Sequence, residues 1–128
     1  MSKLKKFEEF VGVETDLFLK YWDKYYQYKK RAKTKGLKFL VSFERFYSLL
    51  TAKCYICDLD GRKNELGIDR LNNKKGYTEF NIVGCCWDCN RMKSDMTMSE
   101  FSVYIKRINP EHKLAKMFDK YREVNEKK

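Results

Sequence analysis

The chain has 128 residues, a length that suits one domain with a helix or two attached. Hydrophobic residues make up 43% and aromatic residues 16%, which supports a modest core and argues against disorder although 36% of the residues are charged. The sequence contains no run of about 18 apolar residues, so it predicts no membrane-spanning helix. The basic N-terminus lacks the apolar stretch of a secretory signal. The net charge of +10 predicts a polyanionic partner rather than a membrane, although a solvated basic surface is the alternative.

The first element expected along the chain is a long amphipathic helix over residues 15–35, capped by Thr15 or Asp16 and ended by Gly36. Apolar residues recur in it at three- and four-residue steps, which indicates core packing rather than base stacking: Leu17, Phe18, Tyr21, Trp22, Tyr25 and Tyr28. Its C-terminal end carries more positive charge than the helix dipole requires. We therefore predict phosphate contacts by its basic residues Lys29, Lys30, Arg31, Lys33 and Lys35.

A second helix is expected after Ser42, a suitable N-cap, with its apolar face between Phe43 and Leu50. Turn-forming clusters then separate two short predicted strands at 66–71 and 80–83, and helical character returns at 87–94.

Two further helices are expected, one at 99–108 and one from Asn109-Pro110 to about residue 124. The predicted organisation has three parts: a basic helical region at 1–52, a central core at 53–98 and C-terminal helices at 99–128.

Two C-x2-C pairs predict a metal site: Cys54, Cys57, Cys86 and Cys89. Four thiolates at this spacing complete a tetrahedral zinc site of the closed, structural kind. A redox role would use one pair only and would need a βαβ context that the sequence lacks. We expect an intracellular location, in the cytoplasm or the nucleus, because thiols stay reduced there. A viral or phage protein that acts inside the cell fits the same expectation. The fifth cysteine, Cys85, is expected to pack at the strand end, with replacement of Cys86 as ligand as the alternative.

The stretch around these cysteines resembles the HNH endonucleases, a ββα-metal family, in the branch that carries a zinc ribbon. The resemblance covers roughly residues 36–101 and rests on Cys54-x2-Cys57, Gly67-Ile68-Asp69-Arg70, Gly76-Tyr77, Asn81 and Cys86-x2-Cys89-Asn90-x2-Lys93. It implies an α+β fold: a zinc-stabilised ββα-metal core, with a short antiparallel hairpin and a helix, flanked by N- and C-terminal helices.

The same resemblance implies cleavage of DNA with a second metal ion. Asp69 and Asn90 would offer hard oxygen ligands to Mg²⁺ or Mn²⁺. Asn81 would brace the loop between the two strands and orient the catalytic group, and Tyr77 would be one of the catalytic residues. Arg70, Arg91 and Lys93 would contact the nucleic acid, with Arg70 clamping phosphate. A homodimer is implied as well, because one such site cuts one strand.

Position 70 departs from the common pattern of the family, in which a histidine base follows the aspartate. Arg70 cannot accept a proton, and the single histidine, His112, lies in the predicted C-terminal helix as surface or packing. A base would have to come from Tyr55, Tyr77, Glu79 or metal-bound hydroxide. Two alternatives to an endonuclease therefore stay open: a weak or inactive nuclease-derived module that binds DNA or RNA, and a structural or assembly protein on the same scaffold.

The missing histidine gives a pH prediction. A tyrosine base starts from a pKa near 10, so its active fraction at pH 7 is on the order of one in a thousand. We expect slow cleavage that accelerates towards pH 9 in a pH–rate profile. Full activity at pH 6.5 would exclude an unshifted tyrosine as the base.

Overall fold

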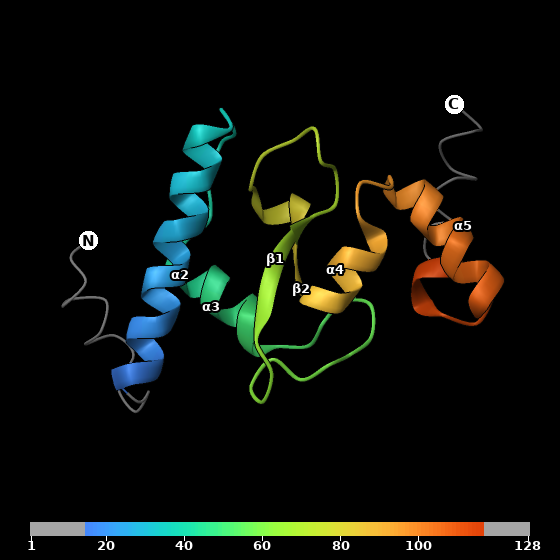
Figure 1. Cartoon of the computed structure of the whole chain (residues 1–128), viewed down its shortest axis with the longest axis horizontal. Coiled ribbons are helices and arrows are strands. Elements are labelled where there is room, and N and C mark those ends of the chain that lie inside the picture. The colour runs from blue at the N-terminus through green and yellow to red at the C-terminus, as the bar shows by residue number, and fades with distance from the viewer. Residues whose placement is uncertain (1–14, 117–128) are drawn as a thin grey trace.

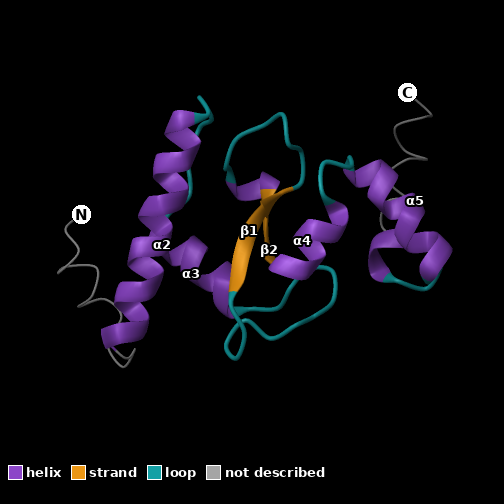
Figure 2. Ribbon diagram, viewed as in Figure 1, coloured by secondary structure: helices purple, strands orange, loops and turns teal. Residues whose placement is uncertain are grey.

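The computed structural model describes residues 15–116, and within them no helix is long and apolar enough to cross a membrane. Two strands form an antiparallel hairpin, and helices lie around it (Figure 1). The elements are α2 (Thr15–Thr34), α3 (Phe43–Thr51), β1 (Leu66–Arg70), the 3-10 turn η1 (Glu79–Asn81), β2 (Ile82–Cys86), α4 (Trp87–Lys93) and α5 (Met98–Ile108). Figure 2 shows the hairpin between α3 and α4, so the predicted α+β class is confirmed.

The N-terminal helices form an aromatic core against the hairpin. Phe18 and Trp22 of α2 are buried and pack their rings on Phe43 of α3, at centroid distances of 5.5 and 5.1 Å. The aromatic stripe of α2 is therefore core, as predicted. Gly36 follows the helix with a φ of 70°, a conformation that only glycine adopts without strain, and the predicted N-cap Ser42 accepts a hydrogen bond from the Arg45 amide.

The hairpin is packed closely on α3. Ile68 lies opposite Gly84 in the register, and a Cβ at Gly84 would come within 2.5 Å of the Leu49 carbonyl oxygen of α3. The first strand agrees with its predicted position, but the second begins at Ile82 instead of residue 80. The prediction was wrong there because residues 79–81 form a 3-10 turn that leaves Phe80 92% exposed.

The C-terminal part begins with α5, whose capping box joins Thr97 and Glu100. A short helical turn follows at 113–116, where Leu114 and Ala115 are buried. The predicted start of this helix at Asn109-Pro110 was wrong, because Asn109 instead accepts from the Glu111 and His112 amides and closes a turn. The rest of the predicted last helix, with Met117, Phe118, Tyr121 and Val124, lies outside the described residues. The division of the chain at residues 52 and 98 stays a prediction.

Candidate active site and metal centre

The four predicted cysteine ligands come together in space. The Sγ atoms of Cys54, Cys57, Cys86 and Cys89 all lie within 4.8 Å of one another. Sulfurs at about 2.3 Å from one tetrahedral zinc ion would be about 3.8 Å apart, and the Sγ atoms of Cys57 and Cys86 are separated by 3.8 Å. Cys86 also caps α4, since its Sγ accepts from the Cys89 amide at 3.4 Å. The cluster fits a structural zinc ion that joins the turn after α3 to the start of α4.

Cys85 lies beside this cluster and is not one of its four members. It is 2% exposed at the end of β2, so the prediction that it packs there is confirmed. Its Sγ donates to the Cys86 carbonyl oxygen at 3.4 Å, and hydrogen bonding by the Cys85 thiol is the main cause that lowers the pKa of Cys54 to about 3. A low thiol pKa favours the thiolate that zinc binds. Cys85 therefore supports a ligand without acting as one.

Asp69 is held in a buried network at the junction of β1 and α4. The residue is 7% exposed. Its carboxylate accepts hydrogen bonds from Lys93 Nζ through Oδ2 at 2.9 Å and through Oδ1 at 3.2 Å. The Tyr55 hydroxyl also donates to Oδ2, at 3.0 Å. Tyr55 follows Cys54 directly, so the zinc turn positions one of the partners of the carboxylate.

Lys93 differs most from its predicted place. We expected its ammonium to contact phosphate, but the side chain is fully buried and bonds Asp69 and the Arg70 carbonyl oxygen. The reason is the helical period: Cys89 and Lys93 are four residues apart, so both face the hairpin. Phosphate contact by Lys93 is not supported by this burial.

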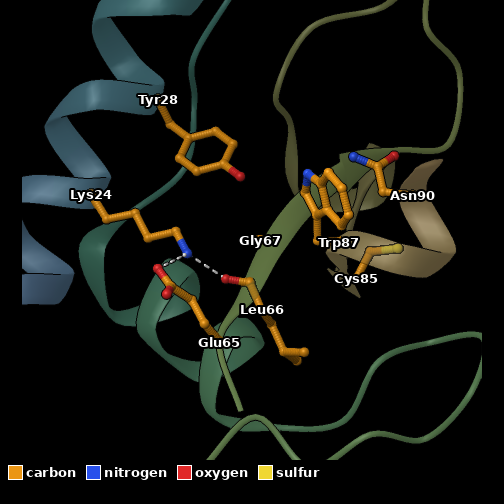
Figure 3. Close-up of a pocket in the computed structure, with 8 residues that line it drawn as sticks. All are labelled: Lys24, Tyr28, Glu65, Leu66, Gly67, Cys85, Trp87 and Asn90. Atoms are coloured by element: carbon orange, nitrogen blue, oxygen red, sulfur yellow. Dashed lines mark hydrogen bonds and ion pairs between the residues drawn. The ribbon is translucent and has the colours of Figure 1, made fainter. Parts of the chain in front are cut away.

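Asn90, by contrast, is exposed and lines a hollow of about 320 Å³ between α2, β1 and α4 (Figure 3). Gly67 lies on the floor of the same hollow, two residues before Asp69 and therefore on the same side of the strand. Asn90 is also one turn from Lys93, which bonds Asp69. Asp69 and Asn90 thus belong to one side of the hairpin, with the carboxylate buried and the amide open to solvent.

The loop between the strands is organised by Asn81, which is 7% exposed. Its amide nitrogen donates to the carbonyl oxygens of Asn72 and Gly76, at 3.1 and 2.9 Å, and its Oδ1 accepts from the Asn72 amide at 2.8 Å. These contacts agree with the predicted bracing of the loop by Asn81. Arg70 holds the same loop from its other side.

Arg70 uses one nitrogen for this, since Nη1 donates to the carbonyl oxygens of Asn73 and Lys75 at 2.7 and 3.0 Å. A guanidinium has five N–H groups, so donors remain on its other nitrogens. The guanidinium also lies 5.3 Å from the centre of the Tyr77 ring.

Tyr77 is 7% exposed and packs against Tyr28 and Phe39. Its amide and carbonyl groups bond the backbone of Lys38 and Leu40, both at 2.8 Å. These contacts make Tyr77 a link between the loop and the N-terminal helices, and they give no support to a catalytic role.

The other candidate bases are placed unfavourably. Burial and the neighbouring Asp69 carboxylate raise the pKa of Tyr55 well above its ordinary value of 10. Glu79 lines a separate hollow with Ser42 and Arg45. His112 bonds the Ile56 carbonyl oxygen through Nε2 at 2.8 Å, while its Nδ1 accepts from the Leu114 amide. The histidine therefore packs on the zinc turn, which agrees with the packing role predicted for it, although it lies just before the helical turn at 113–116 and not inside a helix.

Apart from Lys93, the predicted phosphate contacts on α2, directly after it and on α4 are exposed: Lys29, Lys30, Arg31, Lys33, Lys35 and Arg91. Arg91 lies 4.6 Å from the centre of the Trp87 ring, and Trp87 is 66% exposed beside the hollow. Sequence reasoning missed Trp87, although its position between two cysteine ligands already placed it at the start of α4.

Comparisons with known proteins bear on the fold. No known protein-family profile matches the chain. The rare-cutting HNH restriction endonuclease PacI, whose structure is described as showing an extraordinary mechanism of DNA perturbation, aligns with a TM-score of 0.56. The alignment covers 71% of this chain and 78% of that protein at 22% identity. The chain therefore has the fold that its sequence resemblance implied, a ββα core with a four-cysteine cluster, similar to an HNH endonuclease.

An uncharacterized protein of Acanthamoeba polyphaga mimivirus is 41% identical over 81 residues. The match includes 63% of this chain but only 15% of the viral protein. The chain thus spans a small part of this relative.

The cysteine geometry predicts one zinc ion per chain. Cys57→Ser is expected to abolish zinc binding and to unfold the core, because structural zinc supplies about 10–16 kcal/mol of apparent binding energy. Cys57 is exposed, so its loss removes a ligand without disturbing packing. Cys85→Ala is the matched control and should keep its zinc. Atomic absorption and thermal melting measure both effects, and loss of zinc from Cys85→Ala alone would assign the fourth ligand to Cys85.

The buried ion pair gives a stability prediction. Lys93→Met leaves the Asp69 carboxylate buried without its cation, which should cost about 3–5 kcal/mol of unfolding free energy. Arg91→Met, on the exposed side of the same helix, should change stability by less than about 0.5 kcal/mol. The double variant Asp69→Asn/Lys93→Met removes both charges and should recover part of the loss. Urea denaturation measures all three, and equal stability of Lys93→Met and Arg91→Met would disprove the pairing.

Proposed function

We propose that the chain is a metal-dependent DNA endonuclease of the HNH type that hydrolyses phosphodiester bonds. The observation that carries this proposal is the likeness of its ββα core to PacI, together with Asp69 and Asn90 on the α4 side of the hairpin. PacI itself is described as a DNA-cutting enzyme, and the charge of +10 supports DNA as the partner.

Asp69 and Asn90 are the residues that would hold a catalytic Mg²⁺ or Mn²⁺. Their donor set of one carboxylate and one amide oxygen fits a hard cation that also keeps water and phosphate oxygens as ligands. Two carboxylate oxygens offer about four lone-pair positions, and three hydrogen bonds from Lys93 and Tyr55 leave one open on Asp69. When bound, such an ion neutralises charge on the scissile phosphate and activates water.

Lys93 and Tyr55 are positioning residues in this proposal. They fix the direction of the Asp69 carboxylate from α4 and from the zinc turn respectively. A site held within about 0.5 Å needs such support from packed neighbours. The zinc ion would thus contribute to cleavage through Tyr55, which follows the ligand Cys54.

The substrate phosphates would be bound by Arg70 and by the exposed basic residues of α2. Arg70 is half-buried, and its Nη1 hydrogen bonds to the loop hold the guanidinium in place, so its remaining N–H donors would be presented in a fixed position. A guanidinium with free donors binds phosphate well. The lysines of α2 would bind backbone phosphates farther along the duplex, in a salt-dependent manner.

One observation favours a second candidate function, binding of nucleic acid without cleavage. Both carboxylate oxygens of Asp69 already accept from the Lys93 ammonium, so a divalent ion would share this carboxylate with a cation. Position 70 offers no histidine, and the Tyr55 hydroxyl stays protonated at neutral pH because burial and the Asp69 carboxylate raise its pKa, so it is not available to accept a proton from water.

A plasmid-nicking assay with Mg²⁺ or Mn²⁺ separates the two functions. Asp69→Asn and Asn90→Ala should each slow nicking by about 100-fold or more, since an ion contributes several kcal/mol and about 1.36 kcal/mol is tenfold in rate. Asp88→Asn, an exposed carboxylate on the same helix, is the matched control and should keep the wild-type rate. Nicking by wild type and Asn90→Ala at the same rate would contradict the proposed catalytic site at Asp69 and Asn90, and the absence of nicking by wild type would contradict the endonuclease. Salt-dependent binding without nicking would favour the second function.

A further inference from the structure

We propose that the hollow between α2, β1 and α4 binds an unpaired nucleobase, with Trp87 as the stacking surface. This inference rests on the proposed function, because the base would belong to the DNA strand next to the scissile phosphate. The hollow is lined by Lys24, Tyr28, Glu65, Leu66, Gly67, Cys85, Trp87 and Asn90. Figure 3 shows Lys24 and Tyr28 on one side of it, and Trp87 and Asn90 on the other.

Trp87 has the exposure and the surroundings of a stacking residue. It is 66% exposed, whereas the other tryptophan of the chain, Trp22, is 7% exposed in the core. The Arg91 guanidinium lies over its ring at 4.6 Å but does not line the hollow, so the side of the indole towards the hollow stays accessible. An aromatic ring next to an arginine is the arrangement that binds unpaired bases by stacking.

The opposite wall supplies polar groups at fixed positions. Lys24 Nζ donates to the Leu66 carbonyl oxygen at 2.6 Å and to Glu65 Oε1 at 3.1 Å. The Tyr28 hydroxyl accepts from the Ile68 amide at 3.1 Å, so its own proton can be donated to a ligand. Gly67 keeps the floor open, since a Cβ there would lie 2.6 Å from this hydroxyl.

The charges in the hollow select a base over a phosphate group. The Glu65 carboxylate lies in the wall and already pairs with the Lys24 ammonium, so this cation is engaged within the protein and is not free to bind a phosphate. The charge of Glu65 is balanced by Lys24 and by Lys20, whose Nζ lies 3.7 Å from Oε2. A neutral planar ring can instead stack on Trp87 and bond the Asn90 amide and the Tyr28 hydroxyl. A base in a concave hollow must first leave the stack of a duplex, so the occupant is an unpaired base.

The site adjoins the proposed catalytic residues. Asn90 lines the hollow, and Gly67 lies two residues before Asp69. A base bound against Trp87 would therefore hold its own strand close to Asp69 and Asn90. In this arrangement the enzyme prefers single-stranded or locally opened DNA.

Tryptophan emission tests the proposal without cleavage. In a Trp22→Phe chain, Trp87 is the remaining tryptophan, and its emission should be quenched by a short oligo(dT) in buffer without a divalent ion. The matched chain Trp87→Phe, which keeps Trp22, should show no quenching. A duplex of the same length should quench more weakly. Unchanged Trp87 emission at saturating oligo(dT) would overturn the proposal, as would stronger quenching by the duplex.

A second measurement uses chains whose core is intact. Wild type should bind a 2-aminopurine oligonucleotide with a change in its fluorescence, and Trp87→Ala should weaken binding by about tenfold, the equivalent of one stacked base. Arg45→Ala, an exposed cation outside the hollow, should not. Equal affinity of Trp87→Ala and wild type for the oligonucleotide would overturn the proposed site. Tighter binding of oligo(U) than of oligo(dT) would overturn the proposal that the bound base belongs to DNA. Stacking without nicking would instead contradict only the endonuclease.

Discussion

The cluster of four cysteine thiols is the constraint on which the rest of this small fold depends. The only sheet among the described residues is a hairpin of two strands, and an isolated hairpin is marginal in water. The cluster joins the turn carrying Cys54 and Cys57 to the end of β2 and the start of α4. Two residues of the same turn make further contacts: the Tyr55 hydroxyl bonds Asp69, and the Ile56 carbonyl oxygen bonds His112. One metal site therefore fixes the relative positions of three segments that are distant in the sequence.

The buried pair of Lys93 and Asp69 is the second link, and it changes how the candidate site is understood. A buried ion pair seldom adds net stability, because removing both charges from water costs as much as their attraction returns. Its value lies in position: Lys93 is fully buried and holds the carboxylate at the junction of β1 and α4. A divalent ion at Asp69 would act beside this ammonium. In the proposed function, the balance between these two cations would decide whether the scaffold cuts DNA or only binds it.

We assign the proposed DNA contacts to the exposed side of α4 and to the basic end of α2. Trp87, Asn90 and Arg91 are exposed on α4, although Cys89 and Lys93 of the same helix are buried. The hollow beside Trp87 combines an aromatic wall with a balanced carboxylate. Phosphate binding by lysines and base binding by an indole need different surroundings, and in the proposed complex α2 would supply the first and α4 the second.

Local patterns in the sequence determined the helices up to residue 108, the first strand and the four candidate zinc ligands. The 3.6-residue period placed the aromatic core of α2, and two C-x2-C pairs suffice to define four thiolate ligands because each pair acts within one turn. The burial of Lys93, the packing of Tyr77 and the exposure of Trp87 were decided by tertiary structure alone. Each depends on which face of α4 or of the loop meets the hairpin, and that is set by contacts with residues far along the chain. From the sequence alone Lys93 is expected to be a surface charge, and its burial becomes possible because Asp69 pairs with it in the interior.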